Sequence, residues 1–272
     1  MTALAPSRQS EHPSPFPKAK VDKLRDQGYC IIPGVLTPDA TANVRERLVW
    51  AAEESERRGV PTHLAIDPND RNVRVFHLLE LDEVFRDLIV HPLALQLVNG
   101  LLGEDVLISN FTANIALPGS RSMKVHSDQS IVIPEPWCEP WSMNIIWCLD
   151  DVHAANGATL FLPGSHRIER AAQVGEDPVG RMIPFEAQAG SIIAMDGRMW
   201  HTSGANVTTD VERALLFGYY SRAFIRPQMN WNAALSSMTQ ASVSPQLRAL
   251  LGLNHTANVG LGARLSFDTY AQ

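Results

Sequence analysis

The segment SMKVHSDQSIVI, residues 122–133, combines β-branched residues with a histidine and an aspartate two positions apart. It predicts a β-strand, and because side chains alternate along a strand, His126 and Asp128 would project from the same face. Two polar side chains of this kind are either a hydrogen-bonded surface pair or two ligands of a metal site whose third ligand lies elsewhere. The sequence on either side of the segment bears on this choice.

From residue 105 onward the chain contains further runs of the same character. Each is short, rich in β-branched or aromatic residues, and separated from the next by proline, glycine or asparagine. This spacing predicts an antiparallel barrel or double-sheet sandwich. The runs are DVLISNFTANIAL (105–117), SMNIIWCLDDV (142–152), ATLFLPG (158–164), GSIIAMDG (190–197) and ERALLFGYYSRAF (212–224).

Helices are expected mainly in the first third of the chain. In the segment 37–59, Thr37 is the expected N-cap, Pro38 occupies the first helical position and Gly59 follows the end. A short strand, YCIIPGVL (29–36), precedes this helix. The other expected helices are 21–27, one or two within 81–103, and one or two short helices within 230–252.

The chain is expected to form one domain. Its 272 residues, 45% of them hydrophobic, suffice for a full core, and no repeat or linker interrupts them. We expect residues 1–19 to be a disordered arm because they are rich in proline and serine. Residues 20–250 are expected to form a single, mainly β domain with N-terminal helices, and residues 251–272 a C-terminal tail.

Charge and composition exclude several classes of partner. A net charge of -6 and a pI near 5.8 disfavour nucleic acid and anionic membranes as principal partners. No apolar run approaches the ~20 residues that a membrane-spanning helix needs. Three widely spaced cysteines without a C-x-x-C pair predict reduced thiols. We therefore expect a cytoplasmic protein, monomeric or homodimeric, that acts on a small molecule.

A third metal ligand is available in His201, 75 residues after His126 in GSIIAMDGRMWHTSGAN (190–206). Two histidines and one carboxylate leave positions open on the metal, which is typical of non-haem Fe(II) oxygenases. The absence of a cysteine ligand disfavours a structural zinc site. Arg213 follows twelve residues later, and a guanidinium among Leu215 and other apolar residues would require an anion.

The order of these features resembles the phytanoyl-CoA dioxygenase family. The resemblance rests on features that follow one another along the chain: an N-terminal helix and first strand, His-x-Asp, a glycine-containing turn, a second histidine, an arginine and a segment that contains proline. It extends from about residue 20 to about residue 232. It implies an Fe(II)/2-oxoglutarate-dependent oxygenase with a double-stranded β-helix (jelly-roll) core, which consumes dioxygen. The matching segments are LRDQGYCIIPGVLTPD (24–39), HSD (126–128), NGATLFLPGSH (156–166), His201, Arg213 and RPQMNW (226–231).

Position by position, the resemblance makes His126, Asp128 and His201 the iron ligands. It makes Arg213 the partner of the distal carboxylate of 2-oxoglutarate and Thr159 an assisting residue. From its position two residues after His201, Ser203 can donate to the same carboxylate. Structural alternatives are a salt bridge of Arg213 to Glu212 or Asp210, a plain strand residue at 159 and a turn at 203.

Met123 stands where some relatives have a glutamine that contacts the cosubstrate. Either Asn144 or Arg74 takes that contact, or the cosubstrate sits differently. Arg74 and His77 precede the barrel, in a segment that relatives use near the mouth of the active site; structural packing is the alternative. His166 is expected to end a tight turn after Gly164 rather than to bind metal.

The expected reaction is hydroxylation, desaturation or a related C–H oxidation of a small, largely apolar molecule, in specialised metabolism. The segments 60–80, 130–142 and 225–240 are expected to shape the pocket, and tryptophans 137, 141 and 147 either line it or belong to the core. The alternatives are an acyl-CoA or amino-acid hydroxylase, a non-catalytic jelly-roll binding protein that retains a metal, and a zinc- or manganese-dependent cupin-type enzyme.

Overall fold

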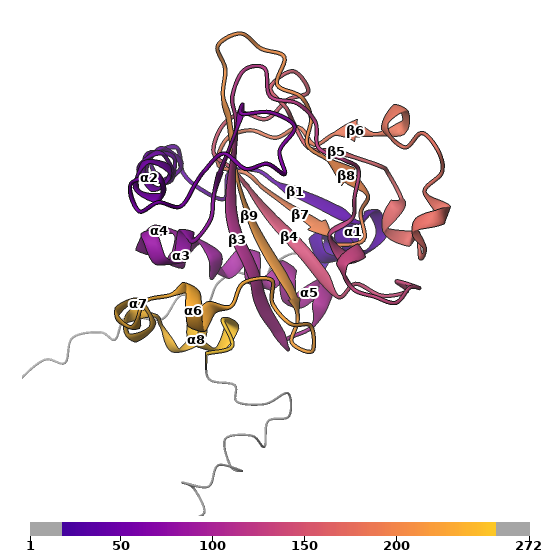
Figure 1. Ribbon diagram of the computed structural model, residues 1–272. Helices are drawn as coiled ribbons and strands as arrows, with labels where there is room; N and C mark the ends of the chain where they lie inside the picture. Colours follow the sequence, from indigo (N-terminus) through magenta and orange to yellow (C-terminus); the bar gives the residue numbers. More distant parts are fainter. Residues whose placement is uncertain (1–17, 254–272) are drawn as a thin grey trace, which may run out of the picture.

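Two antiparallel sheets form the centre of the fold in the computed structural model, which describes residues 18–253 (Figure 1). The larger sheet has the strand order β1-β7-β4-β9-β3-β2 and the smaller one β6-β5-β8. The larger sheet comprises β1 (Tyr29–Ile32), β2 (Asn72–Val75), β3 (Val106–Ala116), β4 (Ser142–Cys148), β7 (Ile192–Asp196) and β9 (Arg213–Arg222). The smaller comprises β5 (Leu160–Phe161), β6 (Ile183–Pro184) and β8 (His201–Thr202).

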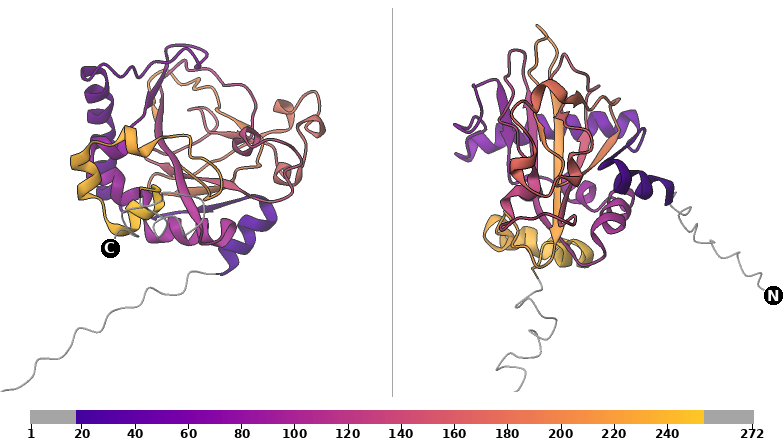
Figure 2. Two further views of the ribbon diagram at one scale, coloured as in Figure 1. Left: turned by 60° about the horizontal axis from the view of Figure 1, so that its bottom comes forward. Right: turned by 90° about the vertical axis from the view of Figure 1, so that its right-hand side faces the viewer.

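Helices flank the larger sheet, and most of them come from the first third of the chain (Figures 1 and 2). The last three, drawn in yellow, gather near one end of β3 and β9. The helices are α1 (Lys18–Gln27), α2 (Pro38–Arg57), α3 (Leu78–Leu81), α4 (Glu83–Ile89), α5 (Pro92–Leu102), α6 (Trp231–Ala234), α7 (Ser237–Ser242) and α8 (Pro245–Leu250). Single 3-10 turns are η1 (Asp128–Ile131), η2 (Ser165–Arg167), η3 (Ala171–Gln173) and η4 (Val179–Arg181).

The larger sheet separates two apolar cores. In β4, Met143, Ile145 and Trp147 pack into the core on the helical side, whereas Ile146 and Cys148 face the core between the two sheets. A strand that is covered on both faces reads as a continuous apolar run, which explains why SMNIIWC shows no alternation. Asn144 is the polar exception within this run, and it lies in a cavity.

The expected start of α2 is confirmed in atomic detail. The Thr37 hydroxyl accepts a hydrogen bond from the Ala40 amide at 3.2 Å, and Pro38 is the first helical residue. The C-terminal segment differs from the expectation of one or two helices, because it forms three. Ser236 and Ser244 each begin a new helix by accepting a backbone N–H with the hydroxyl, which divides the segment into short helices.

The prediction of a strand over residues 122–133 is wrong. His126 forms an isolated antiparallel bridge with His201, through backbone hydrogen bonds of 3.0 and 2.8 Å, and Asp128 already begins η1. The chain turns there because the Gln129 amide donates to the Gly197 carbonyl at 2.7 Å instead of extending a ladder. His126 and Asp128 therefore do not meet through the period-two alternation of a strand.

The fold class is confirmed: a mainly antiparallel jelly-roll with flanking helices. The expected arm at 1–19 and tail at 251–272 fall largely on residues 1–17 and 254–272, which lie outside the described residues, and the domain boundaries stay a prediction. Between residues 18 and 253, none of the helices combines the length and the apolar character needed to cross a bilayer.

The three thiols differ in burial, and this predicts their reactivity. Cys30 and Cys148 are buried and Cys138 is exposed; none is in a disulfide. Burial raises the pKa of the Cys30 thiol, and it raises the pKa of Cys148 to about 12, which disfavours the reactive thiolate form of both. We expect one thiol per chain to react rapidly with a chromogenic disulfide at pH 8, and three in denaturant.

The variant Cys138→Ala is the control, because it should lose the rapid phase and keep the two thiols that react after unfolding. A rapid phase that persists in Cys138→Ala would contradict this assignment.

Candidate metal centre

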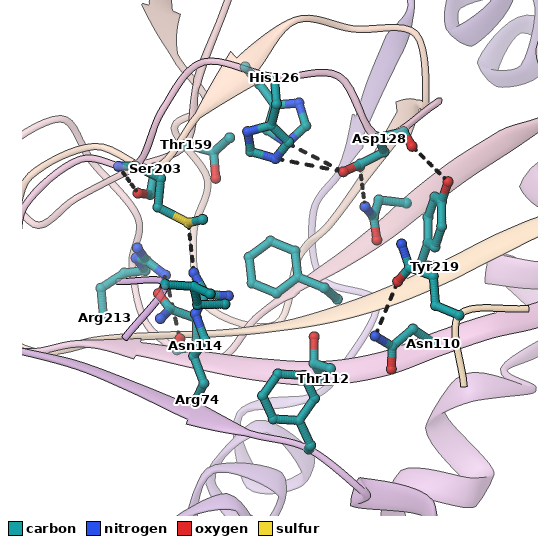
Figure 3. A pocket seen from close by; sticks show the side chains of 17 residues that line it. Arg74, Asn110, Thr112, Asn114, His126, Asp128, Thr159, Ser203, Arg213 and Tyr219 are labelled. Atoms are coloured by element: carbon teal, nitrogen blue, oxygen red, sulfur yellow. Dashed lines mark hydrogen bonds and ion pairs between the residues drawn. The ribbon is translucent and has the colours of Figure 1, made fainter. Parts of the chain in front are cut away.

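The structure brings His126, Asp128 and His201 together, although they come from a bridge, a 3-10 turn and a two-residue strand (Figure 3). Their ligand atoms all lie within 4.8 Å of one another. Asp128 Oδ1 is 3.8 Å from the Nε2 atoms of both histidines. One carboxylate oxygen and two imidazole nitrogens thus face a common point.

Backbone carbonyls determine which nitrogen of each imidazole carries the proton. His126 Nδ1 lies 2.9 Å from the Lys124 carbonyl, and His201 Nδ1 lies 2.9 Å from the Met199 carbonyl. A carbonyl oxygen only accepts, so each Nδ1 donates and each neutral ring keeps its lone pair on Nε2. Burial lowers the pKa of the His201 imidazole, which favours the neutral ring. Both lone pairs point toward Asp128.

Two side chains from neighbouring strands hold Asp128. Asn144 Nδ2 in β4 donates to Asp128 Oδ2 at 2.6 Å, and the Tyr219 hydroxyl in β9 donates to the Asp128 backbone carbonyl at 3.0 Å. The Tyr219 hydroxyl is a donor because burial raises its pKa and keeps it protonated. The second carboxylate oxygen is therefore occupied, and Oδ1 is the one directed at the histidines.

This donor set fits a divalent transition metal. The 3.8 Å separations exceed hydrogen-bonding distance, so the histidines and the aspartate do not satisfy one another directly. An ion with metal–nitrogen and metal–oxygen bonds of about 2.0–2.2 Å can bridge atoms at that separation. Hydrogen bonds from each Nδ1 to a carbonyl are the usual outer support of metal-binding histidines. The site thus offers two histidines and one carboxylate, a ligand set that leaves coordination positions of a metal open for other groups.

Arg213 is a buried cation that forms no salt bridge with a described residue. It is 1% exposed, and its guanidinium donates to the Gly157 carbonyl at 2.8 Å and to Asn114 Oδ1 at 3.2 Å, while Nε has no partner. The alternative of a salt bridge to Glu212 or Asp210 on a solvent face is wrong, because Arg213 is buried, Glu212 pairs with Arg45, and no ion pair joins Arg213 to Asp210 among the described residues.

Burial lowers the pKa of Arg213 to about 10, so the side chain remains charged at neutral pH. A buried charge of this kind is stabilised by an anionic ligand. Figure 3 shows Arg213 and Asn114 at one end of the cavity, with Asp128 and Tyr219 at the other.

Thr159 and Ser203 both line this cavity. The Ser203 hydroxyl accepts a hydrogen bond from the Met123 amide at 3.0 Å, and the neighbouring Thr202 hydroxyl donates to the Met123 carbonyl at 2.6 Å. Ser203 thus ties the segment that carries His126 to the strand that carries His201. Its hydroxyl hydrogen is still available to a ligand, since the hydroxyl only accepts in this contact.

Arg74 and Met123 lie in the cavity and touch each other. Arg74 Nε donates to both carboxylate oxygens of Asp67, at 2.9 and 2.7 Å, and its Nη2 contacts Met123 Sδ. Its charge is therefore already compensated. His77 is not among the residues that line the cavity; it precedes α3 with a left-handed φ of 58°.

Sequence reasoning missed most of the cavity wall opposite the histidines. Asn110, Thr112 and Asn114 alternate along β3, and Phe217 and Tyr219 follow Arg213 on the same face of β9. The period-two rule, counted from Arg213, would have found the β9 pair. The described residues that line the cavity are Ile66, Arg74, Phe76, Asn110, Thr112, Asn114, Met123, His126, Asp128, Asn144, Thr159, His201, Ser203, Arg213, Phe217, Tyr219 and Gln228.

The segments expected to shape the pocket are only partly confirmed. Residues 60–80 and 225–240 each contribute to the lining, whereas 130–142 contributes none of it. The three tryptophans do not line it either; Trp137 and Trp147 are buried. His166 lies in the turn after Gly164, whose φ is 76°, as expected.

A jelly-roll that places two histidines and one carboxylate beside a buried guanidinium defines a class of proteins, the non-haem metal-dependent oxygenases. The chain belongs to the phytanoyl-CoA dioxygenase family, whose sequence profile matches residues 24–214. This membership confirms the expected activity class, an Fe(II)/2-oxoglutarate-dependent dioxygenase that consumes dioxygen and acts on a small molecule. A non-catalytic binding protein is thereby excluded.

Individual proteins are similar to this chain in sequence or in fold. The chain is 49% identical over 240 residues to the dioxygenase af480 of Aspergillus fumigatus, an alignment that covers 88% of this chain and 78% of that protein. Its fold is similar to that of SnoK, a non-haem alpha-ketoglutarate-dependent carbocyclase from nogalamycin biosynthesis (TM-score 0.61, 23% identity, 82% of this chain and 92% of SnoK). It is also similar to HygX from Streptomyces hygroscopicus, solved with nickel and 2-oxoglutarate bound (TM-score 0.62, 16% identity, 78% and 89%).

Proposed function

We propose that His126, Asp128 and His201 hold the Fe(II) of this dioxygenase, and that the cavity beside them binds 2-oxoglutarate and the substrate. The observation that carries the proposal is the convergence of both Nε2 atoms on Asp128 Oδ1, in the same cavity as a buried guanidinium that forms no salt bridge with a described residue. With 2-oxoglutarate and dioxygen, bound iron supplies an oxidant for a C–H bond, and 2-oxoglutarate leaves as succinate and carbon dioxide.

Arg213 binds the distal carboxylate of 2-oxoglutarate in this proposal. Its buried planar guanidinium offers donors in the geometry that a carboxylate accepts. Thr159 and Ser203 lie in the same cavity and have hydroxyls suited to the same anion. HygX, with 2-oxoglutarate bound in a similar fold, supports a cosubstrate site of this kind.

The substrate is a small molecule without net charge in the part that enters the cavity. Of the two arginines that line it, Arg74 is paired with Asp67 and Arg213 is assigned to the cosubstrate, which leaves neither for an anionic substrate. The wall offers amides and hydroxyls at Asn110, Thr112 and Gln228, together with the apolar side chains of Ile66, Phe76 and Phe217. This combination favours a neutral molecule with hydroxyl or carbonyl groups over an acyl-CoA or an amino acid.

The reaction proposed for this substrate is hydroxylation, desaturation or a related oxidation, in specialised metabolism; the similarity to SnoK of nogalamycin biosynthesis supports that setting. A cytoplasmic location is supported by the three cysteines that form no disulfide. Assembly as a monomer or homodimer stays a prediction that light scattering will test.

A cosubstrate assay tests the proposal. Protein loaded with Fe(II) under anaerobic conditions, mixed with 2-oxoglutarate and a panel of neutral small molecules, is expected to form succinate when oxygen is admitted. Protein treated with a chelator should form none, and reloading with Fe(II) should restore it. Absence of succinate from iron-loaded protein across the panel would contradict the proposal, and equal activity with zinc or manganese in place of iron would favour a cupin-type enzyme.

A further inference from the structure

Asn144 and Tyr219 are paired across β4 and β9, and both contact Asp128. They are directly opposite each other in the strand register. Asn144 donates to the carboxylate and Tyr219 donates to the backbone carbonyl of the same residue. Asp128 itself lies in a 3-10 turn outside the sheet, so these two contacts connect its position to the rigid six-stranded sheet.

The orientation of the Asn144 amide follows from its neighbour. Asp128 Oδ2 only accepts hydrogen bonds when ionised, so the atom of Asn144 at 2.6 Å from it is the nitrogen and not the oxygen. Asn144 is 6% exposed, and its Oδ1 has no partner among the described residues. Burying an acceptor without a partner costs free energy, so burial of Oδ1 does not by itself favour this orientation of the amide. The hydrogen bond to Asp128 is the contact that holds the Asn144 side chain in it.

We propose that Asn144 is a positioning residue that directs one oxygen of Asp128 at the metal and withholds the other. This inference rests on the proposed iron site. The two oxygens of a free carboxylate are equivalent, and a carboxylate can use both on one metal. With Oδ2 engaged by Asn144, Oδ1 is the oxygen that lies 3.8 Å from both Nε2 atoms, which leaves an additional position for the cosubstrate or dioxygen.

A direct contact of Asn144 with 2-oxoglutarate, in place of the glutamine that Met123 replaces, would have to use the rest of its amide. One N–H of its amide is committed to Asp128, and the shortness of that contact marks a charge-assisted hydrogen bond. In the positioning role, Asn144 acts through Asp128 rather than on a reacting group.

Cobalt(II) binding tests the inference without requiring the substrate. Asn144→Leu keeps the branching of the side chain at Cγ, at a somewhat greater volume, and removes the donor, whereas Asn144→Ala removes both the branch and the donor. We expect each variant to bind Co(II) about 10–100-fold more weakly than the unaltered protein, the usual effect of losing an outer partner of a metal ligand. We also expect a change in the visible absorption of bound Co(II), because the carboxylate is free to bind through both oxygens.

Asn110→Leu is the matched control, since Asn110 is an amide in the same cavity that contacts none of the three ligands. It should leave the Co(II) affinity and spectrum unchanged. Tyr219→Phe removes only the hydrogen bond to the backbone carbonyl and should weaken Co(II) binding with little change in the spectrum. Thermal melting of the metal-free proteins verifies that all four variants fold.

The outcomes separate the two proposals. If the unaltered protein fails to bind Co(II), the proposed iron site is wrong and the role of Asn144 falls with it. If the unaltered protein binds Co(II) and Asn144→Leu matches its affinity and spectrum, the iron site stands and the positioning role is overturned. Weak binding by Asn144→Ala alone, with normal binding by Asn144→Leu, would show that the side chain only fills space.

Discussion

Replacement of Asp128 by alanine is expected to reduce succinate formation by more than a hundredfold, because loss of a ligand should cost more than the ~10–100-fold that loss of an outer partner of a ligand usually costs. In the proposed iron site Asp128 is the single anionic ligand, and without it the two imidazoles alone would hold the metal. The measurement is the rate of succinate formation with saturating 2-oxoglutarate, together with the amount of iron retained after gel filtration.

The fold should survive this substitution. The carboxylate is bonded to Asn144 and to no other described residue, and its replacement removes no apolar contact of either core. We therefore expect the melting temperature of the metal-free variant to stay within a few degrees of that of the metal-free parent. Asp128→Asn, which keeps the shape and loses the charge, should show the same loss of activity. Retention of iron and of activity in both variants would refute the assignment of Asp128.

Replacement of Arg213 is expected to act on the cosubstrate rather than on the metal. Arg213→Gln should raise the KM for 2-oxoglutarate by about 10–100-fold, since hydrogen bonds to a charged group are worth about 1.5–3 kcal/mol. Arg213→Lys should recover part of this affinity, because it restores the charge without the planar fork. The affinity for Co(II) should be unchanged in both variants, and initial rates over a range of 2-oxoglutarate concentrations measure the effect.

A binding measurement verifies the same role independently of turnover. Because 2-oxoglutarate compensates a buried charge, it should raise the melting temperature of the Co(II)-loaded parent protein and raise that of Arg213→Gln much less. Arg222→Lys is a control on the same strand, outside the cavity and paired with Glu139. An unchanged KM and an unchanged thermal shift in Arg213→Gln would show that 2-oxoglutarate binds elsewhere.

Much of the fold could be predicted because local patterns in this sequence agree with its tertiary structure. The strands β3, β4, β7 and β9 lie within the apolar runs from which they were expected, and α2 begins at Thr37 as its capping pattern indicated. The prediction of a strand over residues 122–133 failed because the β-branched residues of this segment are equally compatible with a loop. Whether it pairs as a strand depends on Gly197 and His201, which are distant in the chain.

By itself the sequence determined the architecture, the three candidate ligands and the arginine at position 213, since each depends on residue chemistry and order. Only the tertiary structure decided how they meet: the bridge between His126 and His201, the turn at Asp128, and the strand register that sets Asn144 against Tyr219. These are long-range contacts, and a hydrogen bond between residues far apart in the chain is selected by the packing of the whole sheet. No local pattern contains that information.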